Sequence, residues 1–108
     1  MCLSKSRDLK LAFNSLCGYA SVNHLHFHLY YQSHMLPVQH LALTPVPDTD
    51  LHTLAPDTYP APAWVWTLDT ATDNNNIGQT ITKVAESVHK LTDWLSNNDI
   101  AHNVFIIK

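Results

Sequence analysis

The chain has 108 residues, of which 45% are hydrophobic and 14% charged, and its formal net charge is −3. Its six Lys and Arg residues are scattered, so it has no basic stripe for a nucleic-acid backbone, and no run approaches the ~20 apolar residues of a membrane helix. We therefore expect one small domain that binds neither nucleic acid nor membranes. Two cysteines are too few for a disulfide framework and the N-terminus lacks the apolar core of a secretory signal, so we expect a cytoplasmic protein.

The first third of the chain predicts two strands joined by a turn. Residues 8–14 form the first candidate strand, which ends at Asn14. Gly18 is the residue of the following turn that we expect at a special backbone angle. Ser21–Tyr31 is the second strand, because it alternates and is rich in β-branched and aromatic residues. The two strands are close enough in sequence to pair as a hairpin.

The middle of the chain predicts a loop and a third strand. Five of the six prolines lie between Thr44 and Pro62. Because proline fixes φ and has no backbone N–H, we expect a surface loop here instead of a long strand or helix. Ala63–Leu68 then alternates as a strand, which places Trp64 and Trp66 on one face.

The C-terminal part predicts an amphipathic helix. Its apolar residues recur at spacings of 4, 3, 4, 3 and 4 and form one continuous stripe. These residues are Ile77, Ile81, Val84, Val88, Leu91 and Leu95. The charged residues off the stripe are Lys83, Glu86, Lys90 and Asp93. Asp73–Asn76 supplies candidate N-caps, and Asn97 and Asn98 can end the helix.

Ile100–Ile107 predicts a closing strand. The elements together predict an α+β fold, in which an antiparallel sheet packs against the helix. We divide the chain into residues 1–70, which hold the histidine strand and the proline-rich loop, and residues 71–108, which hold the helix and the closing strand. Because both ends of the chain lie at or near strands, we interpret the two parts as pieces of one incomplete domain.

Three histidines alternate along the second predicted strand. Period 2 places His24, His26 and His28 on one face. Four apolar residues fall on the opposite face and are expected to anchor the strand in a core: Leu25, Phe27, Leu29 and Tyr31. Imidazole can serve as nucleophile, acid or base near neutral pH, so the polar face predicts an active-site floor.

From the residues alone, two chemistries are open. A neutral imidazole can attack phosphorus and hold a nucleotidyl group, with Asn14, Gly18 and Ser21 supplying hydrogen-bond donors to the phosphate. Alternatively, a His-x-His pair on a strand can bind zinc with a third ligand from another element. Candidates for that third ligand are His34, His40, His52 and Asp50.

Three separated segments resemble the GDP-hexose phosphorylases, a branch of the histidine triad superfamily. They are Phe13–His28, Tyr59–Pro62 and Ile100–Phe105, in the same order as in the family. The resemblance favours the nucleophile over a metal site and implies no cofactor. It also implies the substrates, GDP-hexose and inorganic phosphate, which would become GDP and hexose 1-phosphate.

The resemblance further implies a role for each polar residue of the site. His26 would attack the α-phosphorus and form a guanylyl-histidine, which phosphate then resolves. His24 would position His26, His28 would contact the transferred phosphate or the departing oxygen, and Asn14 and Ser21 would hold phosphate oxygens. The histidine at position 28 favours GDP-D-glucose as the sugar nucleotide. The alternatives are a nucleotide hydrolase of the same superfamily and a truncated, inactive fragment.

Overall fold

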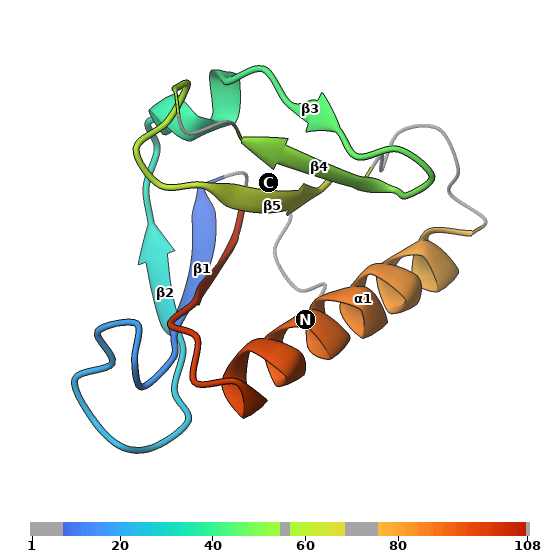
Figure 1. Ribbon diagram of the computed structural model, residues 1–108. Coiled ribbons are helices and arrows are strands. Elements are labelled where there is room, and N and C mark those ends of the chain that lie inside the picture. The colour runs from blue at the N-terminus through green and yellow to red at the C-terminus, as the bar shows by residue number, and fades with distance from the viewer. Residues whose placement is uncertain (1–7, 55–56, 69–75, 108) are drawn as a thin grey trace. The chain divides into compact units, whose positions relative to one another are not determined.

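The structure is a computed structural model that describes residues 8–54, 57–68 and 76–107 (Figure 1). Its elements are β1 (Leu9–Asn14), β2 (His28–Tyr31), a 3₁₀ turn (Pro37–His40), β3 (Thr44–Pro45), β4 (Leu51–Leu54), β5 (Ala63–Trp66), α1 (Ile77–Asn97) and β6 (Asn103–Ile106). The strands form two antiparallel three-stranded sheets, which together with α1 confirms the α+β class. Within the described ranges, no helix has the length and hydropathy needed to cross a membrane.

The chain divides into two units, each with its own sheet. One unit consists of Met1–Met35 and Val88–Lys108, and the other of Leu36–Ser87. Strands β2, β1 and β6 form the sheet of the first unit, and β3, β4 and β5 form that of the second.

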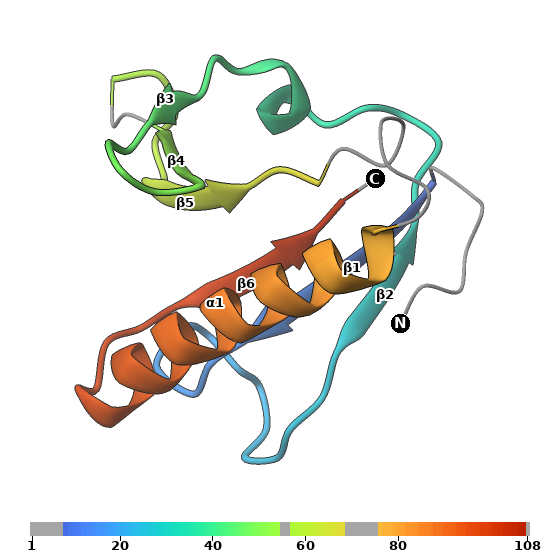
Figure 2. The ribbon, with the colours of Figure 1, turned by 90° about the vertical axis from the view of Figure 1, so that its right-hand side faces the viewer.

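The first sheet carries the histidine segment and has β1 at its centre. Strand β1 pairs with β2, with Ala12 opposite His28, and with β6, with Asn14 opposite Asn103. Figures 1 and 2 show the three strands side by side. The predicted pairing of the first two strands and the predicted closing strand are both confirmed.

The histidine strand is shorter than predicted. Only His28–Tyr31 belongs to β2, whereas residues 21–27 form bends and irregular chain. The ladder with β1 stops at the pair Ala12–His28, and residues 21–25 lie beyond the last residue of β1, Asn14, after which the chain turns.

The expectation that the alternate apolar residues anchor a core is also wrong. Leu25, Phe27, Leu29 and Tyr31 are between 56% and 77% exposed. The face of a strand is buried only where another element packs over it, and the described residues leave these side chains largely in solvent.

The second sheet corrects the prediction of a loop between Thr44 and Pro62. Strands β3 and β4 form a hairpin in that region, closed by a hydrogen bond of 2.9 Å from the Val46 N–H to the Leu51 carbonyl. Proline is tolerated because Pro45 lies in the edge strand and Leu51–Leu54 contains none. The predicted strand near Trp64 is confirmed as β5, which pairs with β4.

Helix α1 has the bounds that the periodicity predicts. Leu95 on the apolar stripe is buried, the other stripe residues are half-buried, and the four charged residues off the stripe are exposed. The chain leaves the helix through Asp99, whose φ is 56°. The Asp99 N–H donates to the Ser96 carbonyl at 3.2 Å and the Ile100 N–H to the Leu95 carbonyl at 2.9 Å, which is a Schellman motif. Of the expected N-caps, residues 73–75 lie outside the described residues.

Candidate functional site

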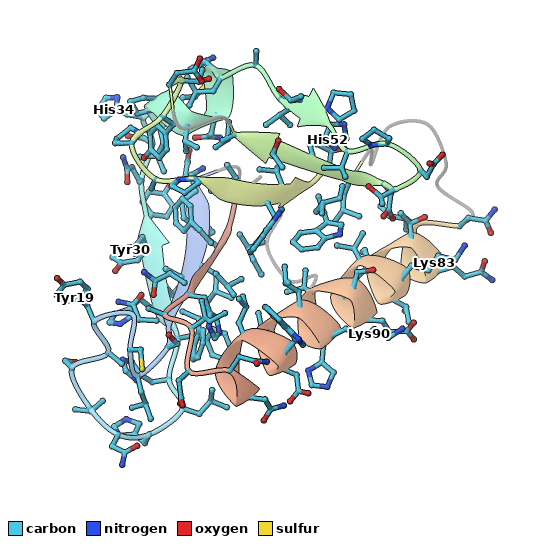
Figure 3. The ribbon with its side chains drawn as sticks, viewed as in Figure 1. Tyr19, Tyr30, His34, His52, Lys83 and Lys90 are labelled. Atoms are coloured by element: carbon cyan, nitrogen blue, oxygen red, sulfur yellow. The ribbon has the colours of Figure 1, made fainter. Side chains whose placement is uncertain are left out.

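The three histidines of the first unit form a continuous row of rings. The ring centroids of His24 and His26 are 5.1 Å apart, and those of His26 and His28 are 4.9 Å apart. Tyr30, the next residue of the alternation, stacks on His28 at 6.0 Å (Figure 3 labels Tyr30). The three rings therefore lie next to one another as predicted, although only His28 belongs to a strand.

A backbone contact fixes the proton of His26. The Nδ1 atom of this half-buried imidazole lies 3.1 Å from the carbonyl oxygen of His24. A carbonyl oxygen can only accept, so in the neutral ring Nδ1 carries the proton and Nε2 keeps its lone pair. That lone pair can attack an electrophile. The contact involves the main chain of His24 and not its imidazole, and the positioning role expected of His24 stays a prediction.

The ladder registers identify the residues that share this face of the sheet. Residues directly opposite one another point to the same side, so Ala12 accompanies His28 and Lys10 accompanies Tyr30. Asn14, two residues after Ala12, lies on the same side. Lys10 is buried, with 3% exposure, and the sequence analysis missed it. Lys10 and Asn14 are four residues apart in the sequence. In a strand this even spacing places both side chains on the same face, which is the signal that could have identified Lys10.

A small depression of about 170 Å³ lies where the turn after β1 meets the start of the histidine row. Its lining residues are Phe13, Asn14, Leu16, Ala20, Asn23, His24 and Leu25. Two amides and an imidazole therefore face a mostly apolar wall. Of the site residues expected from the sequence, Asn14 and His24 line the depression, whereas His26, His28, Gly18 and the exposed Ser21 do not.

Gly18 does not adopt the backbone angle that we expected. Tyr19 does, with φ of 68°, and its side chain is almost fully exposed (Figure 3). Gly18 is buried, and its N–H donates to the Ser15 carbonyl at 2.9 Å. Glycine is required here for space: a Cβ would lie 2.7 Å from the His102 carbonyl oxygen and 3.0 Å from the Ser15 hydroxyl.

The start of β6 belongs to this site as well. The His102 ring packs near Phe13, with centroids 6.4 Å apart, and its Nδ1 atom lies 3.0 Å from the Ile100 carbonyl oxygen. Asn103 is opposite Asn14 in the ladder. Neither residue has a role in the expectations from the sequence, because both are far from Phe13 and Asn14 along the chain and only the fold brings them together.

The described residues offer no support for a zinc site. Within residues 8–54, 57–68 and 76–107, no three His, Cys, Asp or Glu side chains are grouped so that they could hold a metal ion. The candidate third ligands His34, His40, His52 and Asp50 therefore complete no such group there.

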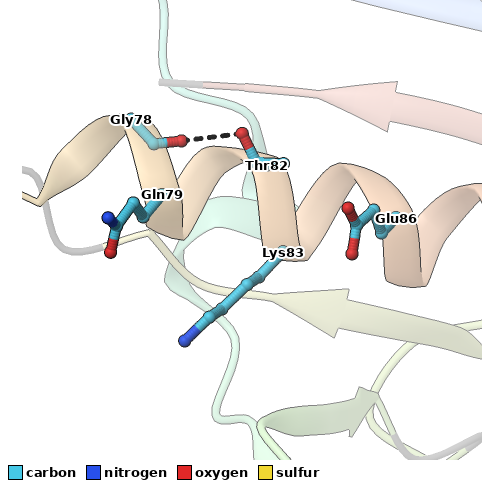
Figure 4. A pocket seen from close by; sticks show the side chains of 5 residues that line it. All are labelled: Gly78, Gln79, Thr82, Lys83 and Glu86. Atoms are coloured by element: carbon cyan, nitrogen blue, oxygen red, sulfur yellow. Dashed lines mark hydrogen bonds between the residues drawn. The ribbon is translucent and has the colours of Figure 1, made fainter.

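A larger hollow of about 410 Å³ lies along the first turns of α1 (Figure 4). It is lined by Gly78, Gln79, Thr82, Lys83 and Glu86. All five residues come from one helix, and the Thr82 hydroxyl donates to the Gly78 carbonyl at 2.9 Å. A surface made by one helix alone has no opposite wall to enclose a ligand, so we assign it no function.

Comparison with known proteins identifies relatives of the chain. It is 35% identical to GDP-D-glucose phosphorylase 1 of Xenopus laevis and 36% identical to that of Homo sapiens, in each case over 107 residues, or 98% of the chain. Identity to the Caenorhabditis elegans protein of the same name is 30% over 99 residues. No protein-family model and no solved structure matches the chain.

The matches cover only part of the relatives. The chain spans 24% of the Xenopus laevis protein, 26% of the human protein and 19% of the Caenorhabditis elegans protein. The resemblance inferred from the sequence is confirmed, at the length of a fragment. Over nearly its whole length, this chain is similar to one segment of proteins named GDP-D-glucose phosphorylase 1.

Proposed function

We propose that the chain supplies the histidine that transfers GMP in a GDP-D-glucose phosphorylase. The proposed reaction converts GDP-D-glucose and inorganic phosphate to GDP and glucose 1-phosphate. One observation carries the proposal: the contact of His26 Nδ1 with the His24 carbonyl, which in the neutral ring favours the tautomer with the lone pair on Nε2, within a row of three imidazoles. The relatives that match this segment are named for the same reaction.

In the first step, Nε2 of His26 attacks the α-phosphorus of GDP-D-glucose. An N–P bond forms, the bond from the α-phosphorus to the bridging oxygen breaks, and glucose 1-phosphate leaves with the electron pair. The imidazole becomes positive as it attacks, and its Nδ1–H donates to the His24 carbonyl throughout. In this proposal His28, whose ring neighbours that of His26, contacts the phosphate or the leaving oxygen, and the Asn14 amide donates to a phosphate oxygen.

In the second step, inorganic phosphate attacks the same phosphorus. The new P–O bond forms, the N–P bond breaks, and GDP leaves while Nε2 regains its lone pair. If water were the acceptor, the product would be GMP and the protein a nucleotide hydrolase.

The proposal includes membership of the histidine triad superfamily, a cytoplasmic location and a further phosphate contact from Ser21. Since the Gly18 N–H is already bonded within the turn, Gly18 is the weakest of the proposed phosphate contacts.

The test uses a chimaera in which this chain replaces the matched segment of the Xenopus laevis relative. We expect glucose 1-phosphate to be released only when phosphate is present, and a guanylyl group to accumulate on His26 when it is omitted. The variant His26→Ala should lower turnover by about 10⁴-fold or more, since it removes the proposed nucleophile. His89→Ala, which removes an exposed histidine of α1, is the matched control and should leave turnover unchanged.

Each other result would overturn part of the proposal. GMP formed without phosphate would indicate a hydrolase. Normal GDP release by His26→Ala would exclude His26 as the nucleophile. A folded chimaera that neither turns over nor forms the adduct, beside an active relative, would show that this sequence is an inactive segment.

A further inference from the structure

The turn after β1 is tied to the start of β6 by contacts across 87 residues of sequence. The Ser15 N–H donates to the His102 carbonyl at 3.1 Å, and the His102 N–H donates to the Ser15 hydroxyl at 3.1 Å. With its amide nitrogen turned toward the carbonyl oxygens of His102 and Gly18, Asn103 donates to both at 2.9 Å. One side chain thus bridges the strand and the turn.

The packing around Gly18 shows how closely this bridge is fitted. A Cβ at Gly18 would lie 2.5 Å from the side-chain amide of Asn103, closer than real Cβ contacts allow. Two further bonds close the turn on itself, because the N–H groups of Gly18 and Ala20 donate to the Ser15 carbonyl at 2.9 and 3.2 Å. The turn is therefore held both from within and by Asn103.

The turn leads directly into the candidate site. Asn14 precedes it, and Ala20, Asn23 and His24 follow it, and all four line the depression. Asn103 lies opposite Asn14 and on the same face of the sheet. The path of the chain between Asn14 and His24 therefore depends on what holds the turn.

We propose that Asn103 is a positioning residue of the guanylyl-transfer site, acting through the Gly18 carbonyl to hold the turn that shapes the depression. The inference rests on the proposed function and assigns Asn103 a role in binding the nucleotide sugar. The contact that prepares His26 is local, from Nδ1 to a carbonyl two residues away, and does not involve the turn. Loss of the bridge should consequently raise KM much more than it lowers kcat, since the loosened turn must be ordered again on binding.

The test compares Asn103→Asp and Asn103→Ala with a matched control. Asp nearly preserves the shape of Asn but cannot donate to the two carbonyls, so both variants lose the bridge. The control is Asn98→Ala, since the Asn98 side chain also donates to a backbone carbonyl, that of Trp94 at 2.8 Å, at the end of α1. In the chimaera we expect both Asn103 variants to raise KM for GDP-D-glucose about 10-fold with kcat within about 3-fold of wild type.

Amide hydrogen exchange in the chain itself gives a second readout. The amides of Ser15, Gly18 and Ala20 should exchange at least about 10-fold faster in both Asn103 variants than in the wild type. Their exchange rates should be unchanged in Asn98→Ala. If the chimaera is active and an Asn103 variant lowers only its melting temperature, with KM unchanged, Asn103 is merely structural and the inference fails while the proposed function stands. An inactive, folded wild-type chimaera would overturn both, and unchanged exchange would by itself exclude the bridge.

Discussion

Gly18 and Gly78 have opposite reasons for being glycine, although they are the two glycines of the chain. A Cβ at Gly18 would lie within 3.0 Å of three groups, whereas a Cβ at Gly78 would meet nothing within 4 Å. We predict that Gly18→Ala lowers the free energy of unfolding by about 2 kcal/mol, because the turn must shift away from the start of β6. Gly78→Ala should raise it by up to about 1 kcal/mol, since alanine is the better helix former.

The two glycine variants form a matched pair, and urea unfolding of the chain measures both. The expected signs differ, so an effect of the same sign and size at both positions would contradict the packing around Gly18. Neither described glycine has a positive φ, so alanine is not strained by the backbone conformation at either position. The loss of stability expected for Gly18→Ala therefore comes from crowding of the new Cβ.

The residues of the site were only partly predictable from sequence. The sequence spacing of His24, His26 and His28 correctly predicts neighbouring rings, although only His28 lies in a strand. Lys10 and Asn103 were missed because their place on the histidine face depends on the β1–β2 and β1–β6 registers. The proton position on His26 depends on a carbonyl of the main chain, which no pattern of side chains reveals.

At the scale of elements, the end of α1 holds a residue in an unfavourable conformation. Asp99 adopts a left-handed φ of 56°, which costs an ordinary L-residue about 1 kcal/mol or more. Its carboxylate also lies near the negative end of the helix dipole. We predict that Asp99→Gly raises the free energy of unfolding by about 1 kcal/mol, because glycine suits the C′ position of a Schellman motif.

The control for this prediction is Ser96→Gly, an exposed position inside α1. There the same new residue should destabilise by about 0.5–1 kcal/mol, since glycine loses backbone entropy in a helix. Thermal unfolding followed by circular dichroism compares the two. A lower melting temperature for Asp99→Gly would show that the aspartate side chain stabilises the helix end by more than its backbone strain costs.

Elements with a local cause were predicted better than those that need a partner. Helix α1 follows from its own apolar stripe, β5 from an alternating run, and β1 and β6 from short local segments. Strand β2 begins only at His28, because its ladder with β1 ends at the Ala12–His28 pair and residues 21–25 lie beyond the end of β1. The hairpin of β3 and β4 was missed because the density of prolines hid the proline-free segment Leu51–Leu54 and the edge position of Pro45.

At the scale of the whole molecule, little apolar surface is fully buried. Among the described residues, Leu54 and Leu95 are the hydrophobic residues in that class, one in each of the two units. The amphipathic pattern of the sequence was read correctly on α1, yet it overestimated the core beside the histidine segment. Alternation states which residues share a face, but burial of that face depends on what packs against it.

One face of the first sheet carries a row of apolar side chains in solvent. Leu29 and Ile106 lie on either side of Leu11 in the ladder, and they are 64% and 50% exposed. Both belong to the outer strands of the described sheet, where unpaired edges favour association.

We predict that the chain associates with itself as its concentration rises. The double variant Leu29→Lys with Ile106→Lys should weaken association at least about 10-fold, because burying two such side chains is worth a few kcal/mol. Met35→Lys, at a position 61% exposed and outside the strands, should not. Sedimentation velocity over a concentration series measures this, and a wild-type chain that stays monomeric throughout would show that the row does not drive association.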